Sequence, residues 1–316
     1  MSRDWSPRPA AHAASSTASD LAGSTRQARD RTGQRPSCLA GGGITLLRAN
    51  GQNEILCRCD SGAYGYLSIA AHAHSLSVEV RYAGVDILAD PRAFRYYALR
   101  AWRSYFRSTI AHNTAELGGR SQSAAPGLFA GKRHALARQI EVLDDGDIAR
   151  WTAEHDGYAG LDPSVLHRRS VLLDRASRSI DIIDQIDGGG HDIRLAFHLG
   201  PDVRAELKES CAVLNWSTAS APGAARLELP PGLRWSVHRG ETDPILGWYS
   251  HGLGRRVPAV TLLGCGHCVP EMPLISRLEF LEVRKSGKSA LSQQAISWTT
   301  SAARSDRGPE SQPEAR

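Results

Sequence analysis

Apolar and polar residues alternate along most of the chain between about residues 41 and 285. The alternation is clearest in four segments: Ile180 to Ile186, Arg194 to Leu199, Arg226 to Pro230 and Arg277 to Val283. A period of two predicts β-strands, because successive side chains of a strand point to opposite faces. Turn-forming sequences occur at Asp144, Gly188, Ala221 and Pro230. Only Ala98 to Tyr105 keeps a helical period. The pattern therefore predicts an all-β fold, a β-sandwich of two antiparallel sheets.

The two ends of the chain differ from this middle part. Residues 1–40 are rich in Ala, Ser, Thr, Arg and Pro without apolar periodicity, and residues 286–316 have a similar composition. Such segments bury too little apolar surface to offset the entropy of ordering the chain. We therefore predict a disordered segment at 1–40, a β-sandwich domain at 41–285 and a disordered tail at 286–316. The hydrophobic content of 41% is sufficient for a core.

Composition and charge narrow the possible partners. A formal net charge of +5 suits an acidic partner such as an acidic polysaccharide. The arginines are scattered, and the sequence has no recognition helix, aromatic RNA-binding motif or basic block, so we expect no nucleic acid partner. The sequence has no run of about 18 apolar residues, and its N-terminus lacks the apolar core of a signal peptide. As written, it predicts no membrane association and a cytoplasmic location.

Four residues have side chains of the types that bind zinc. His72 and His74 lie two positions apart in the strand-like sequence GYLSIAAHAHSLSVEV, so both imidazoles would point to one face of a strand. Asp90 and His112 follow as candidate partners. Imidazole and carboxylate groups are common zinc ligands, and three of them leave a coordination position open. From spacing alone, the alternative is a pair of ordinary surface or core histidines.

Several motifs in a fixed order resemble the C-terminal β-sandwich domain of heparinase II/III-like polysaccharide lyases. That family has an HGHADxLSxE-type motif, a DPG segment, a WRxYFRST segment and an AHNT segment. The counterparts here are His72 to Glu79, Asp90-Pro91, Trp102 to Thr109, and Ala111 to Thr114. Further similar segments begin at His167, Arg194 and His238. The resemblance covers about residues 43 to 285.

The resemblance implies roles for individual residues. It places His72 at the active site and makes His74, Asp90 and His112 the ligands of a zinc ion. Arg107, in the WRxYFRST-like segment, is a candidate for binding a uronate carboxylate, since a guanidinium pairs bidentately with that group. In the same segment we expect Trp102 and Phe106 to pack in the core.

Two departures from the family pattern bear on the site. Only Ser75 separates His74 from Leu76, which we interpret as a two-residue deletion that removes the motif Asp. A gap-free alternative places His72 at the family's metal-binding His, His74 at the Asp and Ala70 at the first His. After Asp90-Pro91, the family's glycine is replaced by Arg92. A glycine there indicates positive φ or a close backbone approach, which an arginine does not easily tolerate.

Other reactive side chains receive structural interpretations. The Cys57/Cys59 and Cys265/Cys268 pairs could form a zinc site only if they converge in space, and we expect them to be free thiols. His198, His238 and Trp248 are expected to be structural. For Asn113 and Thr114 two roles remain open: orienting His112, or ending a turn or strand.

The chemistry implied by the resemblance is β-elimination on a uronate-containing polysaccharide such as heparin, heparan sulfate or alginate. In the family, further essential groups come from an N-terminal α/α toroid of some hundreds of residues. Residues 1–40 cannot form one, so we expect the chain alone to be a weak or inactive lyase that needs a separate toroid domain. Location in the periplasm or outside the cell is also common in the family. The alternative is a truncated, non-catalytic carbohydrate-binding or scaffold sandwich in bacterial exopolysaccharide metabolism.

Overall fold

The computed structural model describes residues 38–39, 43–51, 53–62, 72–92, 100–123, 135–218, 222–252, 254–270 and 272–281. All of these belong to one compact unit, residues 1–282. The predicted disordered segments at 1–40 and 286–316 lie almost wholly outside the described residues. The domain boundaries at 41 and 285 therefore remain predictions.

An antiparallel five-stranded sheet is formed by the first part of the described chain. Its strand order follows the sequence: β1 (Cys38–Leu39), β2 (Ile44–Ala49), β3 (Ile55–Asp60), β4 (Val78–Tyr82) and β5 (Val85–Leu88). Burial alternates along β2, so every second side chain faces the interior. Buried and less buried side chains alternate along these strands, as expected for an antiparallel sheet with one face on the core.

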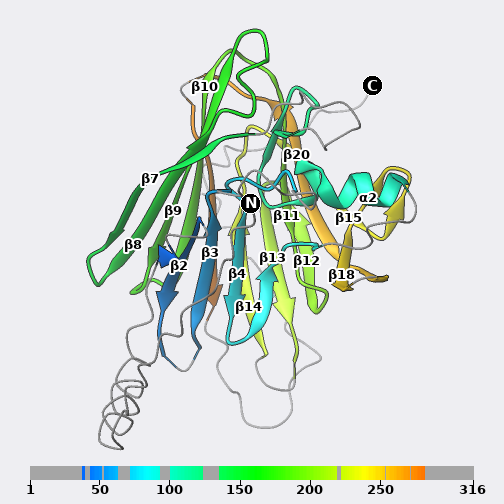
Figure 1. The fold of residues 1–316 in the computed structure, drawn as a ribbon. Coiled ribbons are helices and arrows are strands. Elements are labelled where there is room, and N and C mark those ends of the chain that lie inside the picture. Colours follow the sequence, from blue (N-terminus) through cyan, green and yellow to red (C-terminus); the bar gives the residue numbers. More distant parts are fainter. Residues whose placement is uncertain are drawn as a thin grey trace, which may run out of the picture. The chain divides into compact units, whose positions relative to one another are not determined.

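An antiparallel eight-stranded sheet forms the largest layer (Figure 1). Its order is β12-β13-β14-β21-β10-β9-β8-β7. The strands are β7 (Ala137–Asp144), β8 (Ile148–His155), β9 (Val165–Asp174), β10 (Ser179–Gly188), β12 (Val203–Lys208), β13 (Cys211–Trp216), β14 (Gly223–Glu228) and β21 (Leu274–Leu281). Burial alternates without interruption along the ten residues of β9. One face of this sheet therefore packs on the core, and β7 and β12 are its edges.

A four-stranded sheet of order β15-β20-β11-β6 completes the sandwich. Its strands are β6 (Ala115–Leu117), β11 (Asp192–His198), β15 (Arg234–Arg239) and β20 (Val260–His267). Two hairpins pair β16 (Glu241–Thr242) with β17 (Ile245–Leu246), and β18 (Trp248–Gly252) with β19 (Arg255–Pro258). A bridge between Leu88 and Leu199 joins this sheet to the end of β5. The three sheets share one apolar core, to which Leu47, Trp151 and Phe197 belong.

The described residues contain one α-helix, α2 (Arg100–Arg107), followed by the 3-10 turn η3 (Thr109–Ala111). In Figure 1, α2 lies beside β15 and β18. Tyr105 and Phe106 on this helix form a second apolar cluster with Leu246 and Leu263, and Trp102 packs against it. The expected core packing of Trp102 and Phe106 is confirmed. No helix in the described residues is long and apolar enough to cross a membrane.

The all-β fold predicted from the sequence is confirmed, with one correction near the site. The four predicted strands appear as β10, β11, β14 and β21, and the helical segment appears as α2, shifted by two residues. His72 and His74, however, were expected on a strand and instead lie in the loop before β4. Their spacing of two therefore does not set their orientation, which depends on contacts made by the loop.

Candidate functional site

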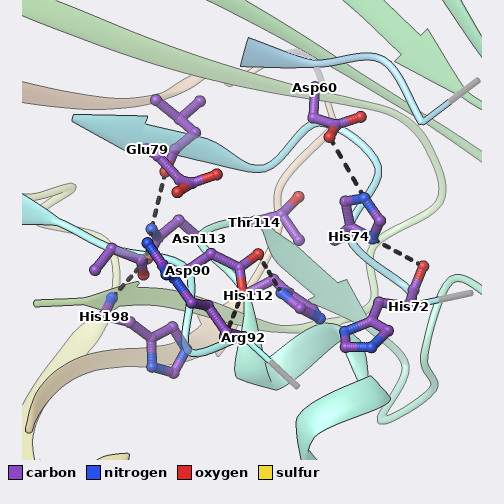
Figure 2. A network of polar contacts seen from close by, with 12 residues as sticks. Asp60, His72, His74, Glu79, Asp90, Arg92, His112, Asn113, Thr114 and His198 are labelled. Carbon is purple, nitrogen blue, oxygen red and sulfur yellow. Dashed lines mark hydrogen bonds and ion pairs between the residues drawn. The ribbon is translucent and has the colours of Figure 1, made fainter. Parts of the chain in front are cut away.

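Three imidazole rings converge where the loop before β4 meets the segment after η3 (Figure 2). The ring centroids of His72 and His74 are 6.2 Å apart, and each lies 5.5 Å from the centroid of His112. His112 is buried, whereas His72 and His74 are partly exposed. The structure thus brings together the three histidines that the sequence singled out.

Asp90 fixes the orientation of His112. Its Oδ2 lies 3.1 Å from His112 Nδ1, and a carboxylate only accepts, so Nδ1 carries the proton. The other ring nitrogen, Nε2, is buried and has no hydrogen-bond partner among the described residues. Burial alone would raise the pKa of Asp90, but the charge and hydrogen bond of His112 outweigh burial and lower it. The result is a carboxylate–imidazole pair whose buried Nε2 points away from the carboxylate.

His74 is held at both ring nitrogens. Nδ1 lies 3.0 Å from the carbonyl oxygen of His72, to which it must donate, and Nε2 lies 3.4 Å from Oδ2 of the buried Asp60. Burial disfavours the charged ring, but the hydrogen bond and charge of Asp60 outweigh burial, so the pKa of His74 is raised. This geometry favours the charged form of His74 and engages both ring nitrogens.

His72 has the opposite proton preference. Burial, followed by the neighbouring charge of His112, lowers its pKa from 6.5 to about 3. Repulsion by the charge of Arg107 contributes in the same direction. The backbone of Arg107 also contacts this loop, because the Ala73 amide donates to the Arg107 carbonyl at 3.0 Å. His72 is therefore a neutral imidazole at neutral pH, able to accept a proton.

Asn113, next to His112, joins three parts of the sandwich. Its Nδ2 donates to the carbonyls of Val78 at 2.8 Å and Ala89 at 3.1 Å, and its Oδ1 accepts from the His198 amide at 2.6 Å. Thr114 Oγ1 donates to the Ser75 carbonyl at 3.2 Å. Of the two roles left open for these residues, the contacts support holding the segment of His112 in place.

Arg92 adopts a left-handed backbone conformation, with φ of 62°. The positive φ inferred from the family's glycine at this position is therefore present, although the residue is an arginine. Its amide donates to Asp90 Oδ1 at 2.6 Å, so the strained turn also helps to hold the carboxylate that orients His112.

The sequence did not single out Asp60 or Arg169. Asp60 ends β3, and Arg169 occupies an inward position of β9, where the surrounding inward residues are Val165, His167, Val171 and Leu173. A charged residue at a core position of an alternating strand is the signal that could have identified Arg169. The sequence around Asp60 has no comparable pattern, because its partner, His74, lies on a loop distant in the sequence.

The other candidate residues make contacts of their own. Cys57 and Cys59 are buried neighbours on β3 with sulfurs 3.9 Å apart, and no disulfide forms among the described cysteines. His198 is buried, with Nε2 donating to the Ile110 carbonyl and Nδ1 accepting from Thr261. His238 bonds to Ser236 and Glu241. The structural roles expected for these histidines agree with these contacts.

The donor types of the cluster fit zinc better than its arrangement does. Imidazole nitrogen and carboxylate oxygen are suitable ligands, and the unpartnered Nε2 of His112 is a ready one. Across the described ranges, however, no group of three or more His, Cys, Asp or Glu side chains is arranged to hold one metal ion. Asp90 already accepts from His112, and both nitrogens of His74 are engaged in other contacts.

The fold and this cluster define the chain as an antiparallel β-sandwich module with a histidine site in its loops. Residues 31–299 match the family described as heparinase II/III-like, C-terminal. The chain therefore belongs to this family, as its motifs indicated. A comparison with curated protein sequences finds no match.

Solved structures with the same fold include two enzymes. Heparan sulfate lyase HepC from Pedobacter heparinus superimposes with a TM-score of 0.63 at 14% identity, covering 85% of this chain and 42% of that one. The heparinase III BT4657 gene product gives a TM-score of 0.61 at 16% identity, covering 76% and 35%. The chain thus spans less than half the length of these proteins, and the likeness concerns the fold.

Proposed function

We propose that this chain is the β-sandwich module of a polysaccharide lyase that cleaves a uronate-containing polysaccharide by β-elimination. The observation that carries the proposal is the convergence of three imidazoles from two segments, with the buried Nε2 of His112 left unpartnered. Membership of the heparinase II/III-like family supports the polysaccharide as the substrate class.

In β-elimination a base removes the C5 proton of the uronate, a C4–C5 double bond forms, and the glycosidic oxygen leaves and takes up a proton. The base needs a free lone pair at working pH. His72 suits this role, because its pKa of about 3 keeps the ring neutral. Its weak basicity means that acidification of the C5 proton, through neutralisation of the carboxylate, must supply much of the rate.

The proposed zinc ligands are His74, Asp90 and His112. When bound, zinc would supply positive charge to neutralise the uronate carboxylate. Zinc binding requires His74 to give up the proton that Asp60 stabilises and Asp90 to share the oxygen that now orients His112. Arg107 is the proposed side chain that pairs with a substrate carboxylate, since its charge lies close enough to lower the pKa of His72.

We further propose that activity requires an α/α toroid domain that forms the opposite wall of the substrate cleft. Groups on opposite sides of a cleft hold the reacting atoms in position, which contributes much of an enzyme's rate acceleration. The sandwich alone would then be weak or inactive on polysaccharide, although it would retain the proposed metal site.

Elemental analysis of the purified protein tests the site. We expect about one zinc per chain in the wild type and loss of that zinc in both His74→Ala and His112→Ala. The matched control is His238→Ala, a histidine on the same sandwich with its own hydrogen bonds to Ser236 and Glu241, which should keep the metal. A wild type without zinc would contradict the metal site and favour a non-catalytic, carbohydrate-binding sandwich.

Activity is tested with a toroid domain added as a separate chain, using heparan sulfate and alginate as substrates. The unsaturated uronate at the new chain end absorbs in the ultraviolet, which gives a direct assay. We expect activity only with the toroid, and its loss in His72→Ala with zinc retained. Equal activity in the wild type and in His72→Ala would remove His72 from the mechanism.

A further inference from the structure

Two chain segments carry the histidine cluster, and both contact one buried side chain of the eight-stranded sheet. That side chain is Arg169 of β9, which is fully buried. Its Nη1 donates to the Leu76 carbonyl at 2.8 Å and also to the Asn113 carbonyl. Leu76 lies two residues after His74, and Asn113 directly follows His112.

We infer that Arg169 is a positioning residue that fixes the separation of the two histidine-bearing segments by holding a main-chain carbonyl of each. A single nitrogen with two hydrogens bonds both carbonyls, so neither segment can move away from the other without breaking a bond to a buried charge. The hydrogen bonds of Arg169 do not depend on the proposed zinc site. The expected effect of Arg169 on metal binding rests on that proposal.

The guanidinium is itself fixed by Asp184, the residue directly opposite on β10. Arg169 Nε and Nη2 donate to Asp184 Oδ1 at 2.7 Å and to Oδ2 at 2.9 Å. Asp184 is also fully buried and accepts from His167 Nε2 at 2.6 Å. The bidentate pair leaves the plane of the guanidinium no freedom to turn, so Nη1 has a defined direction.

Stability alone does not explain this arrangement. Burying an ion pair costs desolvation energy that its attraction only partly offsets, and apolar replacements of similar size are often neutral or stabilising. Leu76, with φ of 62°, adopts a conformation that a leucine enters only under constraint, and its carbonyl is one of the two that Arg169 holds. The strained loop and the buried charge thus meet at the site.

The first variant is Arg169→Lys, which keeps the charge but offers one nitrogen that cannot bridge the carboxylate and both carbonyls. The matched control is Arg277→Lys. Arg277 lies on β21, directly opposite Asp181 of β10, and pairs with it on the exposed face of the sheet. Hydrogen exchange is measured at 72–77 and 112–114, together with zinc affinity and circular dichroism.

We expect a folded Arg169→Lys protein with faster exchange in both segments and a zinc dissociation constant raised about tenfold to a hundredfold. Arg277→Lys should match the wild type. Unchanged exchange in a folded Arg169→Lys variant, or equally faster exchange throughout the sandwich, would overturn the inference.

If Arg169→Lys does not fold, the double variant Arg169→Met with Asp184→Leu removes both buried charges and answers the same question. It should fold and show the same two loosened segments, and unfolding of both variants would indicate a purely structural role and overturn the inference. A wild type without zinc would contradict the proposed function alone, because the exchange measurement still decides the role of Arg169.

Discussion

At the scale of single residues, the three imidazoles have different surroundings although their rings lie within about 6 Å of one another. His72 is neutral because burial and His112 disfavour its charge, whereas Asp60 favours the charged form of His74. His112 donates from Nδ1 to Asp90, and its buried Nε2 has no partner among the described residues. Each difference follows from the burial and the neighbouring groups of the ring, and not from the position of the histidine in the sequence.

Arg92 offers a test of strain beside the site. Replacing it with glycine relieves a left-handed conformation that costs a non-glycine residue about 1 kcal/mol, so Arg92→Gly should raise the free energy of unfolding by about that amount in urea denaturation. Arg92→Ala is the control, since it removes the same side chain but keeps the strained Cβ. If the two variants are equally stable, the backbone at residue 92 is not under strain.

At the scale of elements, Asn113 connects the ends of β4 and β5 with β11. Asn113→Ala leaves two carbonyls and one amide buried without partners, so we expect a loss of about 3 kcal/mol or more in the free energy of unfolding. Asn215→Ala, at an exposed position of β13, should change it little. A similar small effect at both positions would mean that water replaces the Asn113 contacts.

A hydrogen-bonded chain of two imidazoles and a carboxylate crosses β8, β9 and β10. The Gly157 amide donates to His155 Nδ1, His155 Nε2 lies 3.2 Å from His167 Nδ1, and His167 Nε2 bonds Asp184. Each ring thus donates through Nε2 and accepts through Nδ1. Burial lowers the pKa of both His155 and His167, and lowers that of His198 to about 4.

These histidines make the fold sensitive to acid. The unfolded chain takes up protons below about pH 6.5 while the buried rings stay neutral, so stability falls by up to about 1.4 kcal/mol per pH unit for each ring. His72 acts in the same direction. His74 opposes them, because its raised pKa adds stability below pH 6.5 that is lost as the pH rises. The urea concentration at the midpoint of unfolding should therefore decrease from pH 7.5 to 5.5. A midpoint that stays constant over this range would contradict this account.

The sequence predicted the strands well and the site only in part. Alternation identified β10, β11, β14 and β21, and the motifs identified His72, His74, Asp90 and His112. What the sequence could not give was the loop geometry at His72 and His74, which depends on contacts with Asp60 and Arg169. Those contacts join residues distant in the sequence, and no local period records them.

At the scale of the whole molecule, the edge strand β7 exposes apolar side chains. Leu136, just before it, is 73% exposed, and Ile140 and Leu143 are 46% and 51% exposed. Ile140 is the extra residue of a bulge, without a partner on β8. Edge strands with exposed apolar side chains favour association between molecules.

We therefore expect self-association in sedimentation velocity experiments that decreases in the double variant Leu136→Lys with Ile140→Lys, with little change in melting temperature. Val213→Lys, an exposed apolar position within the same sheet, is the control and should leave association unchanged. A wild-type protein that remains monomeric at high concentration would show that these side chains do not form an interface.

The hydrogen bonds that shape the site join distant parts of the chain: Arg169 and Leu76 are 93 positions apart, and Asn113 and His198 are 85 apart. During synthesis the three histidines therefore leave the ribosome well before β9, β10 and β11 exist. Contacts between such distant residues form slowly, because closing the intervening loop costs entropy. A nascent chain arrested before β9 would contain every imidazole of the cluster, with neither Arg169 nor the His198 amide yet made to hold them together.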